Sequence, residues 1–162
     1  MSRPPRRSGF WQRGGVWVLA QSVLMGLVVL AAELDRARPA GTILLPIRVA
    51  GGLLFAWGAL VGMCGALILG GNRTIFPAPN HGSQLVRHGV YRWLRHPLYS
   101  SLMGLSLGWS CLRGSWAAAG ASLLLVAFLR CKAAHEERLL RARFPDYDEY
   151  SRRTRRFLPG LW

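Results

Sequence analysis

Hydrophobic residues along this chain gather in four blocks that are separated by polar segments. The blocks cover residues 16–32, 43–70, 98–112 and 115–129. The first block holds no charged residue, and the second is interrupted only by Arg48, close to its start. Apolar runs of 15 to 28 residues without a period-two alternation indicate helices rather than strands, and they approach the length that crosses a bilayer.

The four blocks differ in length, and the length of each predicts how it fits the thickness of a bilayer. The second block has 28 residues, which as a helix spans about 42 Å and has to tilt, kink or project from a bilayer core of about 30 Å. The last two blocks have 15 residues each, about 22 Å, and only Arg113 and Gly114 separate them. We expect this pair to form a tight helical hairpin that is extended by the polar segments on either side.

Composition supports a membrane protein. The chain is 51% hydrophobic, yet its formal net charge is +14, so the apolar residues and the charges must occupy separate segments. That arrangement is typical of a polytopic membrane protein and not of a nucleic-acid-binding domain. The predicted fold class is therefore all-α, with about four transmembrane helices and an amphipathic cytoplasmic helix that begins near Pro145.

The basic residues also predict an orientation. The head before Val16 carries four arginines, the segment 71–97 carries four, and the tail from Arg130 carries nine basic residues, whereas the other two turns share three. By the positive-inside rule both termini and the 71–97 segment are cytoplasmic. We divide the chain accordingly into a basic head (1–15), two N-terminal transmembrane helices (16–70) and a half that carries the candidate chemistry (71–162), made of a loop, the helical hairpin and the C-terminal helix.

The first candidate for chemistry is the stretch from His88 to Ser101, which ends at the start of the third apolar block. Pro97 suits the first turn of a helix, which places His96 and Tyr99 at its N-terminus. Free N–H groups there attract an anion such as a carboxylate. The alternative interpretation is an interfacial belt of aromatic residues and arginines that binds no ligand.

The second candidate lies after the fourth block, where Glu136 and Glu137 are adjacent and follow Lys132 by one turn. Two glutamates at a membrane edge either balance the surrounding arginines or bind the hydroxyls or ammonium of a polar ligand. The three cysteines and four histidines match no disulfide framework and no metal-binding spacing such as H-E-x-x-H, so the sequence predicts no metal site.

In this order, these segments resemble the isoprenylcysteine carboxyl methyltransferase family and its relatives, the small membrane phospholipid methyltransferases. The resemblance rests on "LVRHGVYRWLRHPLYSS", a helical hairpin, and then "HEERLLRARFPDYDEYSRRTRRFLP". It covers about half of the chain, roughly residues 77–159. The first two predicted helices resemble the family only in being apolar helices, because the quoted motifs lie outside them.

The resemblance implies S-adenosylmethionine as the cofactor, held in a cytoplasmic pocket instead of a soluble Rossmann domain. The implied cofactor residues are Ser83, Gln84, Leu85, Val86, Tyr91, His96, Pro97, Tyr99 and Glu136. Lys132 stands where the prenylcysteine enzymes have an arginine that meets the substrate carboxylate, and Ser83 stands where some members have histidine. Lys132 and Glu137 are the residues that we expect at the substrate.

The expected reaction is methyl transfer to a lipid or lipid-like acceptor, either the carboxylate of an isoprenoid or prenylcysteine-like lipid or a phospholipid amine. Two rival hypotheses are an NADPH-dependent enzyme like the sterol reductases, which share a similar R-H-P and E-E half but need more spans, and a non-catalytic adaptor or lipid-binding protein. The acceptor, its nucleophilic atom and the oligomeric state stay open at this point.

Overall fold

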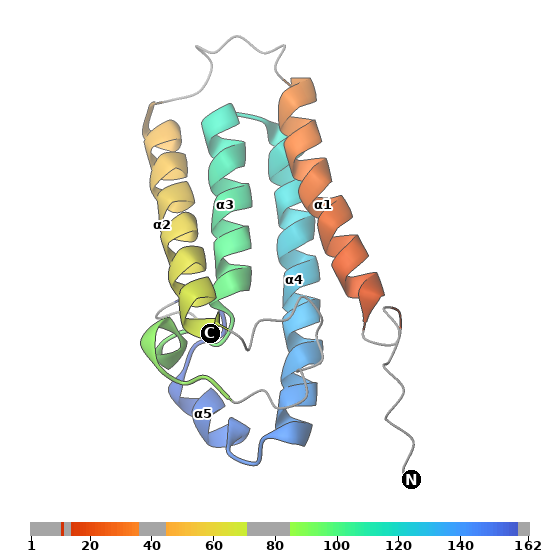
Figure 1. The fold of residues 1–162 in the computed structure, drawn as a ribbon. Helices are drawn as coiled ribbons and strands as arrows, with labels where there is room; N and C mark the ends of the chain where they lie inside the picture. The colour runs from red at the N-terminus through yellow and green to blue at the C-terminus, as the bar shows by residue number, and fades with distance from the viewer. Residues whose placement is uncertain (1–10, 12–13, 36–44, 71–84, 159–162) are drawn as a thin grey trace.

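The computed structural model describes residues 11, 14–35, 45–70 and 85–158. Within these ranges the chain is helical, with five α-helices and one 3-10 helix, η4, and no extended strand (Figure 1). Four long helices stand side by side in the spatial order α2, α3, α4, α1, and the short elements gather at one end of them.

The first two apolar blocks form the helices α1 (Gly15–Leu34) and α2 (Leu45–Leu69), as the sequence predicts. Pro46 lies in the first turn of α2, where its missing N–H leaves no hydrogen bond unmade. Both helices turn many large apolar side chains outward, including Leu19, Val23, Leu53 and Leu60. Helices that bury so few of their apolar residues fit a lipid environment, in which the backbone bonds only to itself.

The third and fourth blocks form α3 (Pro97–Arg113) and α4 (Trp116–Arg143). Gly114 ends α3 in the left-handed conformation (φ 61°), and the Ser115 hydroxyl then accepts a hydrogen bond from the N–H of Ala118 to cap α4. With 28 residues, α4 runs far beyond the apolar block, and its last turns carry Lys132, Glu136 and Glu137. It spans about 42 Å.

Small residues let α2 and α3 pack with their backbones in contact. A methyl group added at Gly58 would lie 2.8 Å from the backbone nitrogen of Leu105, and one added at Gly108 would lie 2.6 Å from that of Phe55. We call this contact the glycine seam; it consists of Gly51, Gly58 and Gly65 on α2 with Gly104 and Gly108 on α3. Close approach of this kind replaces side-chain interdigitation by backbone packing.

The contact between α1 and α4 is built differently, from side chains. Val28 of α1 and Leu125 and Leu129 of α4 form the buried apolar core at this contact. At the far end from the short elements, the Ser115 hydroxyl donates to the Asp35 carboxylate (2.8 Å). Large side chains therefore separate α1 from α4, whereas glycines bring α2 against α3.

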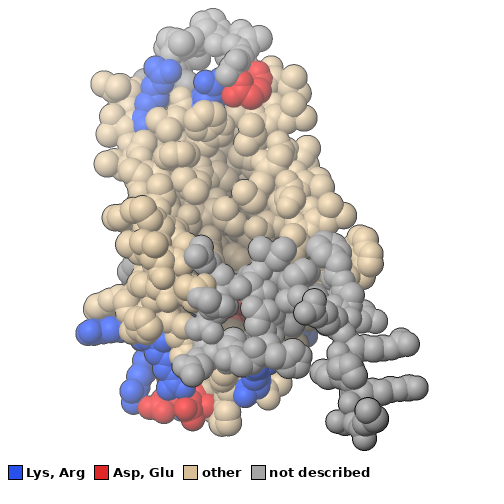
Figure 2. Space-filling view, in the orientation of Figure 1, with Lys and Arg blue, Asp and Glu red and all other residues tan. Residues whose placement is uncertain are grey.

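Three of the described helices, α1, α2 and α4, are long and apolar enough to cross a membrane. With 17 residues, α3 lies at the lower limit of span lengths. Figure 2 shows that Lys and Arg gather at the two ends of the visible face and that other residues form a broad band between them. This distribution is consistent with an integral membrane protein.

The short elements form what we call the polar end: η4 (Gly89–Arg92), the start of α3, the last turns of α4, and α5 (Tyr147–Arg153). The sequence predicts α5 near Pro145 but gives no sign of η4. It also misses a single parallel β-bridge between Leu94 and Arg155, which joins the segment before α3 to the segment after α5.

Candidate functional site

The start of α3 is held in place by the β-bridge. The N–H of Arg95 donates to the carbonyl of Arg155 (2.8 Å), and the N–H of His96 donates to that of Arg156 (3.2 Å). His96 is the N-cap residue and Pro97 occupies the first helical turn, as the sequence predicts. These backbone hydrogen bonds hold the start of α3 against the segment after α5, and the ring of His96 contacts α4 through Glu137.

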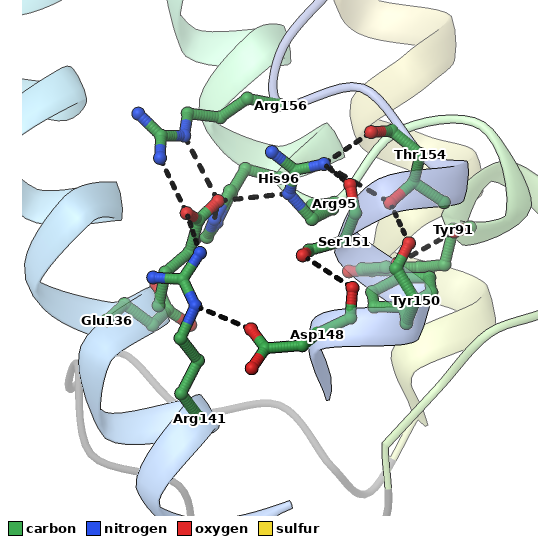
Figure 3. A network of polar contacts seen from close by, with 11 residues as sticks. Tyr91, Arg95, His96, Glu136, Arg141, Asp148, Tyr150, Ser151, Thr154 and Arg156 are labelled. Atoms are coloured by element: carbon green, nitrogen blue, oxygen red, sulfur yellow. Dashed lines mark hydrogen bonds and ion pairs between the residues drawn. The ribbon is translucent and has the colours of Figure 1, made fainter. Parts of the chain in front are cut away.

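Glu137 lies at the centre of this region with a fully buried side chain. Its partners Arg95, His96, Arg141 and Arg156 are labelled in Figure 3. Its Oε1 accepts hydrogen bonds from Arg95 Nε (3.0 Å), His96 Nε2 (3.2 Å) and Arg156 Nε (3.1 Å). Its Oε2 accepts from Arg156 Nη2 (2.6 Å), and Arg141 Nη2 lies 3.7 Å away. We call Glu137 with these four partners the Glu137 cluster.

The cluster ties three segments together. The Arg95 guanidinium also donates to the carbonyls of Ser151 (2.7 Å) and Thr154, at the end of α5. The hydrogen bonds from Arg156 to Glu137 raise the pKa of the arginine above its ordinary value. A buried carboxylate with this many cationic partners stays charged and stabilises the fold as long as none of the partners is removed.

Glu136, the neighbour of Glu137, has a different environment. Its side chain is 23% exposed, and its Oε2 accepts a hydrogen bond from the Tyr99 hydroxyl (2.8 Å). The ring of His96 stacks on that of Tyr99, with the ring centroids 5.3 Å apart and the planes 6° from parallel, and His96 Nδ1 lies 3.8 Å from Glu136 Oε2. A carboxylate that is partly accessible beside a fully satisfied one can still accept hydrogen bonds from a ligand.

Lys132 lies one turn before Glu136 and is buried, with 2% of its surface exposed. Its Nζ donates to the Oε1 of Gln21 on α1 (2.6 Å) and lies 5.3 Å from the centre of the Tyr99 ring. The lysine, the tyrosine and the partly exposed glutamate therefore share one corner of the polar end.

The residues before α3 are joined to α5. Tyr91 of η4 is buried, and its carbonyl accepts a hydrogen bond from the hydroxyl of Tyr150 on α5 (2.7 Å). Burial raises the pKa of Tyr150 to about 12, so this hydroxyl stays protonated at neutral pH. Leu85 and Val86 precede η4 and are half-buried, whereas Ser83 and Gln84 lie outside the described residues.

The structure brings His96, Tyr99, Glu136 and Lys132 together, and their binding of cofactor or substrate stays a prediction. Pro97 faces the opposite way, toward α2, where it packs against Gly65. Glu137 was expected at the substrate, but the structure places it inside the ion cluster, with both oxygens occupied by protein groups.

Sequence reasoning did not predict the contacts of Arg95 and Arg156 with Glu137, or that of Gln21 with Lys132. Arg95 and Arg156 stand inside the two quoted motifs, so their position in the motifs was the available signal. Gln21 offered a weaker signal as one of few polar residues in an apolar block. Across the ranges that the structure describes, no group of three His, Cys, Asp or Glu side chains is arranged to hold a metal ion.

The sequence is similar to that of a known protein and to one family profile. The chain is 32% identical, over 152 residues, to the cobalt-zinc-cadmium resistance protein CzcN of Cupriavidus metallidurans. The match covers 92% of this chain and 64% of that protein, so the chain spans less than two thirds of its relative's length. The profile of the phospholipid methyltransferase family matches residues 47–146, more than half of the 162 residues, and includes the start of α3 and both glutamates. This confirms the resemblance seen in the motifs: the chain belongs to the phospholipid methyltransferase family.

Proposed function

We propose that this protein is an integral membrane methyltransferase that uses S-adenosylmethionine and acts on a lipid or lipid-like acceptor. Family membership supports methyl transfer, and the apolar helices support an acceptor that reaches the site from the membrane. The proposed topology has four spans, with α3 and α4 as a hairpin and both termini in the cytoplasm.

One observation carries the proposal: two adjacent glutamates differ in burial and in the hydrogen bonds that they accept. Glu137 is fully buried and saturated by protein donors, whereas Glu136 is partly exposed and accepts from Tyr99. S-adenosylmethionine presents an ammonium and ribose hydroxyls, which need acceptors, and a carboxylate, which needs donors. Glu136 suits the ammonium or the hydroxyls as an acceptor, and the start of α3 with the ring of His96 suits the carboxylate as a source of donors.

The proposed cofactor site consists of Glu136, Tyr99 and His96, together with Leu85, Val86 and Tyr91, which the family resemblance implies. Pro97 shapes the start of α3, and Ser83 and Gln84 remain candidates from the sequence. We assign Glu137 a positioning role, because it holds His96 through Nε2 and has no oxygen left for an acceptor.

When bound, the cofactor supplies a methyl group that is already activated on a sulfonium. The protein therefore has to align the acceptor and exclude water more than it has to supply acid or base. In this chain His96 and Tyr99 form a stacked pair at the proposed cofactor site. The segment after α5 lies against the start of α3, because the Ser100 hydroxyl donates to the carbonyl of Phe157 (2.6 Å).

Calorimetric titration of the detergent-purified protein with S-adenosylmethionine, and separately with NADPH, tests the proposal. We expect saturable S-adenosylmethionine binding in the parent protein and its loss in Glu136→Gln. Glu149→Gln is the matched control, because Glu149 is exposed and, within the described residues, pairs with Arg153 on its own helix. Binding of NADPH alone would indicate a reductase instead, and binding of neither by a folded protein would favour an adaptor.

A further inference from the structure

Arginines outnumber carboxylates at the polar end. Residues 85–95 and 130–158 include twelve basic residues and five acidic ones. Glu137 is saturated inside its cluster, and Glu136 accepts from Tyr99. The three remaining acids each pair with an arginine: Asp146 with Arg87, Asp148 with Arg141 and Glu149 with Arg153. The arginines outside these pairs and outside the Glu137 cluster therefore have no carboxylate partner within the described residues.

Arg92 is one of these arginines, and it lies over the exposed indole of Trp93. Its guanidinium carbon is 5.3 Å from the centre of the ring, and Trp93 has 61% of its surface exposed. Tryptophan is enriched at the membrane–water interface, where its ring contacts lipid and its N–H contacts headgroups or water. The stacked pair therefore combines an apolar surface with a cation that no described carboxylate neutralises.

The contacts of η4 place this pair at the surface of the membrane. The short helix lies at the end of α2, and a methyl group added at Gly89 would collide with the side chain of Ile68 in the last turn of α2 (Figure 1). α2 is one of the helices that can cross a membrane, and α3 begins four residues after Trp93. Trp116, which is 77% exposed, follows the other end of α3. Two exposed tryptophans thus flank a helix of 17 residues, which is about 26 Å long and close to the thickness of a bilayer core.

The β-bridge adds a second unpaired arginine beside this pair. The N–H of Arg155 donates to the carbonyl of Trp93 (2.9 Å), and the side chain of Arg155 is exposed. Within the described residues no carboxylate forms an ion pair with Arg155. We call Arg92, Trp93 and Arg155 the Trp93 surface. Guanidinium groups bind the oxygens of a phosphate through two parallel N–H groups, so this surface suits a phosphate at the membrane.

We propose that the Trp93 surface binds the headgroup of an anionic phospholipid of the surrounding bilayer. The phosphate pairs with the guanidinium groups, and the indole lies in the interfacial layer beside the acyl chains. A zwitterionic headgroup would bring its own ammonium beside two unpaired arginines, which disfavours it by repulsion. The inference goes beyond methyl transfer, because the surface is made of residues outside the proposed cofactor site and holds lipid as a fixed partner instead of an acceptor.

Two probes with the same short tails test the inference: dioctanoyl phosphatidylglycerol, which is anionic, and dioctanoyl phosphatidylcholine, which is zwitterionic. Each is titrated into the full-length protein in an uncharged detergent, and native mass spectrometry gives the affinity for the first bound lipid. We expect phosphatidylglycerol to bind at least about fivefold more tightly, the effect of one arginine at an anionic surface. Equal affinity for the two lipids would overturn the inference.

Variants separate a defined site from general positive charge. Arg92→Gln and Arg155→Gln are each expected to lower the affinity for phosphatidylglycerol by about fivefold, and Trp93→Leu to weaken both lipids. Arg153→Gln is the matched control, because it removes the same charge from an arginine that is exposed and paired with Glu149. Equal losses in Arg92→Gln and Arg153→Gln would mean that charge alone attracts the lipid, and would overturn the site.

The variants also show where the lipid binds. A preference for phosphatidylglycerol that survives in the double variant Arg92→Gln, Arg155→Gln would place the lipid elsewhere, for example at the acceptor site, and contradict the inference. Displacement of the lipid by glycerol 3-phosphate, which has no acyl chains, would indicate a site for soluble phosphates instead.

Titration of the same samples with S-adenosylmethionine keeps the two proposals apart. Cofactor binding without a headgroup preference would refute the lipid surface and leave the methyltransferase proposal standing. A preference that depends on Arg92 and Arg155, in a folded protein that binds no S-adenosylmethionine, would support the lipid surface and refute the methyltransferase.

Discussion

The glycine seam and the polar end stabilise this molecule in opposite ways. Between α2 and α3, glycines bring two backbones together within the apolar region, and shape alone determines the fit. At the polar end, one carboxylate gathers an imidazole and three guanidinium groups from three segments of the chain. The seam tolerates no added volume, whereas the polar end tolerates no lost charge. A single substitution should therefore have different consequences in the glycine seam and at the polar end.

The largest effect is expected at the polar end. Glu137→Ala leaves four cationic or polar partners without their carboxylate, and removal of one member of a buried ion pair costs about 3–5 kcal/mol. We expect α5 and the segment after it to detach, so that trypsin cuts at the exposed Arg152 and Arg153 while α1 to α4 persist.

Glu149→Ala is the matched control for this comparison, since its ion pair with Arg153 is exposed and such pairs contribute at most about 1 kcal/mol. Equal tryptic cleavage in Glu137→Ala and Glu149→Ala would show that the cluster does not hold the polar end together.

The next effect is expected in the glycine seam. Gly58→Ala or Gly108→Ala places a methyl group against backbone atoms of the neighbouring helix, and overpacking of this kind costs about 1–3 kcal/mol. Thermal unfolding in detergent should shift to lower temperature, while resistance of the polar end to trypsin persists at low temperature. A variant with the parent's melting temperature would mean that α2 and α3 can separate without loss.

A smaller effect is expected where the polar end meets the proposed cofactor. Tyr99→Phe keeps the stack on His96 but removes the hydrogen bond to Glu136, which is partly exposed to solvent and contributes about 0.5–1.5 kcal/mol. We expect weaker S-adenosylmethionine binding in calorimetry with little change in the melting temperature. Unchanged affinity would remove Tyr99 from the site.

The smallest effect is expected at Gly26 in α1, where an added methyl group would meet nothing within 4 Å. Because glycine is a poorer helix former than alanine, Gly26→Ala should stabilise the protein by up to about 1 kcal/mol, measured as a higher melting temperature. This substitution is the counterpart of Gly58→Ala: the same chemical change should have the opposite sign. A destabilised Gly26→Ala would mean that the face of α1 around Gly26 is occupied.

The sequence predicted the long helices well because their signal is local. Continuous apolar runs, Pro97 at a helix start and Gly114 at a helix end each act within a few residues, and the observed bounds of α1, α2 and α3 lie close to the predicted blocks. The sequence also predicted which residues meet at the start of α3, because the quoted motifs resemble a known family.

The sequence could not predict contacts that depend on how the helices are placed. The bridge between Leu94 and Arg155 joins segments about 60 residues apart, and no local pattern marks it. The same is true of the pairing of Gln21 with Lys132 across two helices. Glu136 and Glu137 are chemically identical in the sequence, and only the packing shows that one is buried and saturated while the other is accessible.

Methyl transfer itself is the most direct test of the account. The protein is reconstituted in lipid vesicles and supplied with S-adenosylmethionine that carries a tritiated methyl group, and label is counted in the lipid extract. The account predicts labelled lipid with the parent protein and with Glu149→Gln, and none with Glu136→Gln. Equal labelling by the parent and Glu136→Gln would contradict the proposed site, and a folded parent that labels no lipid from a membrane containing its acceptor would contradict the proposed activity.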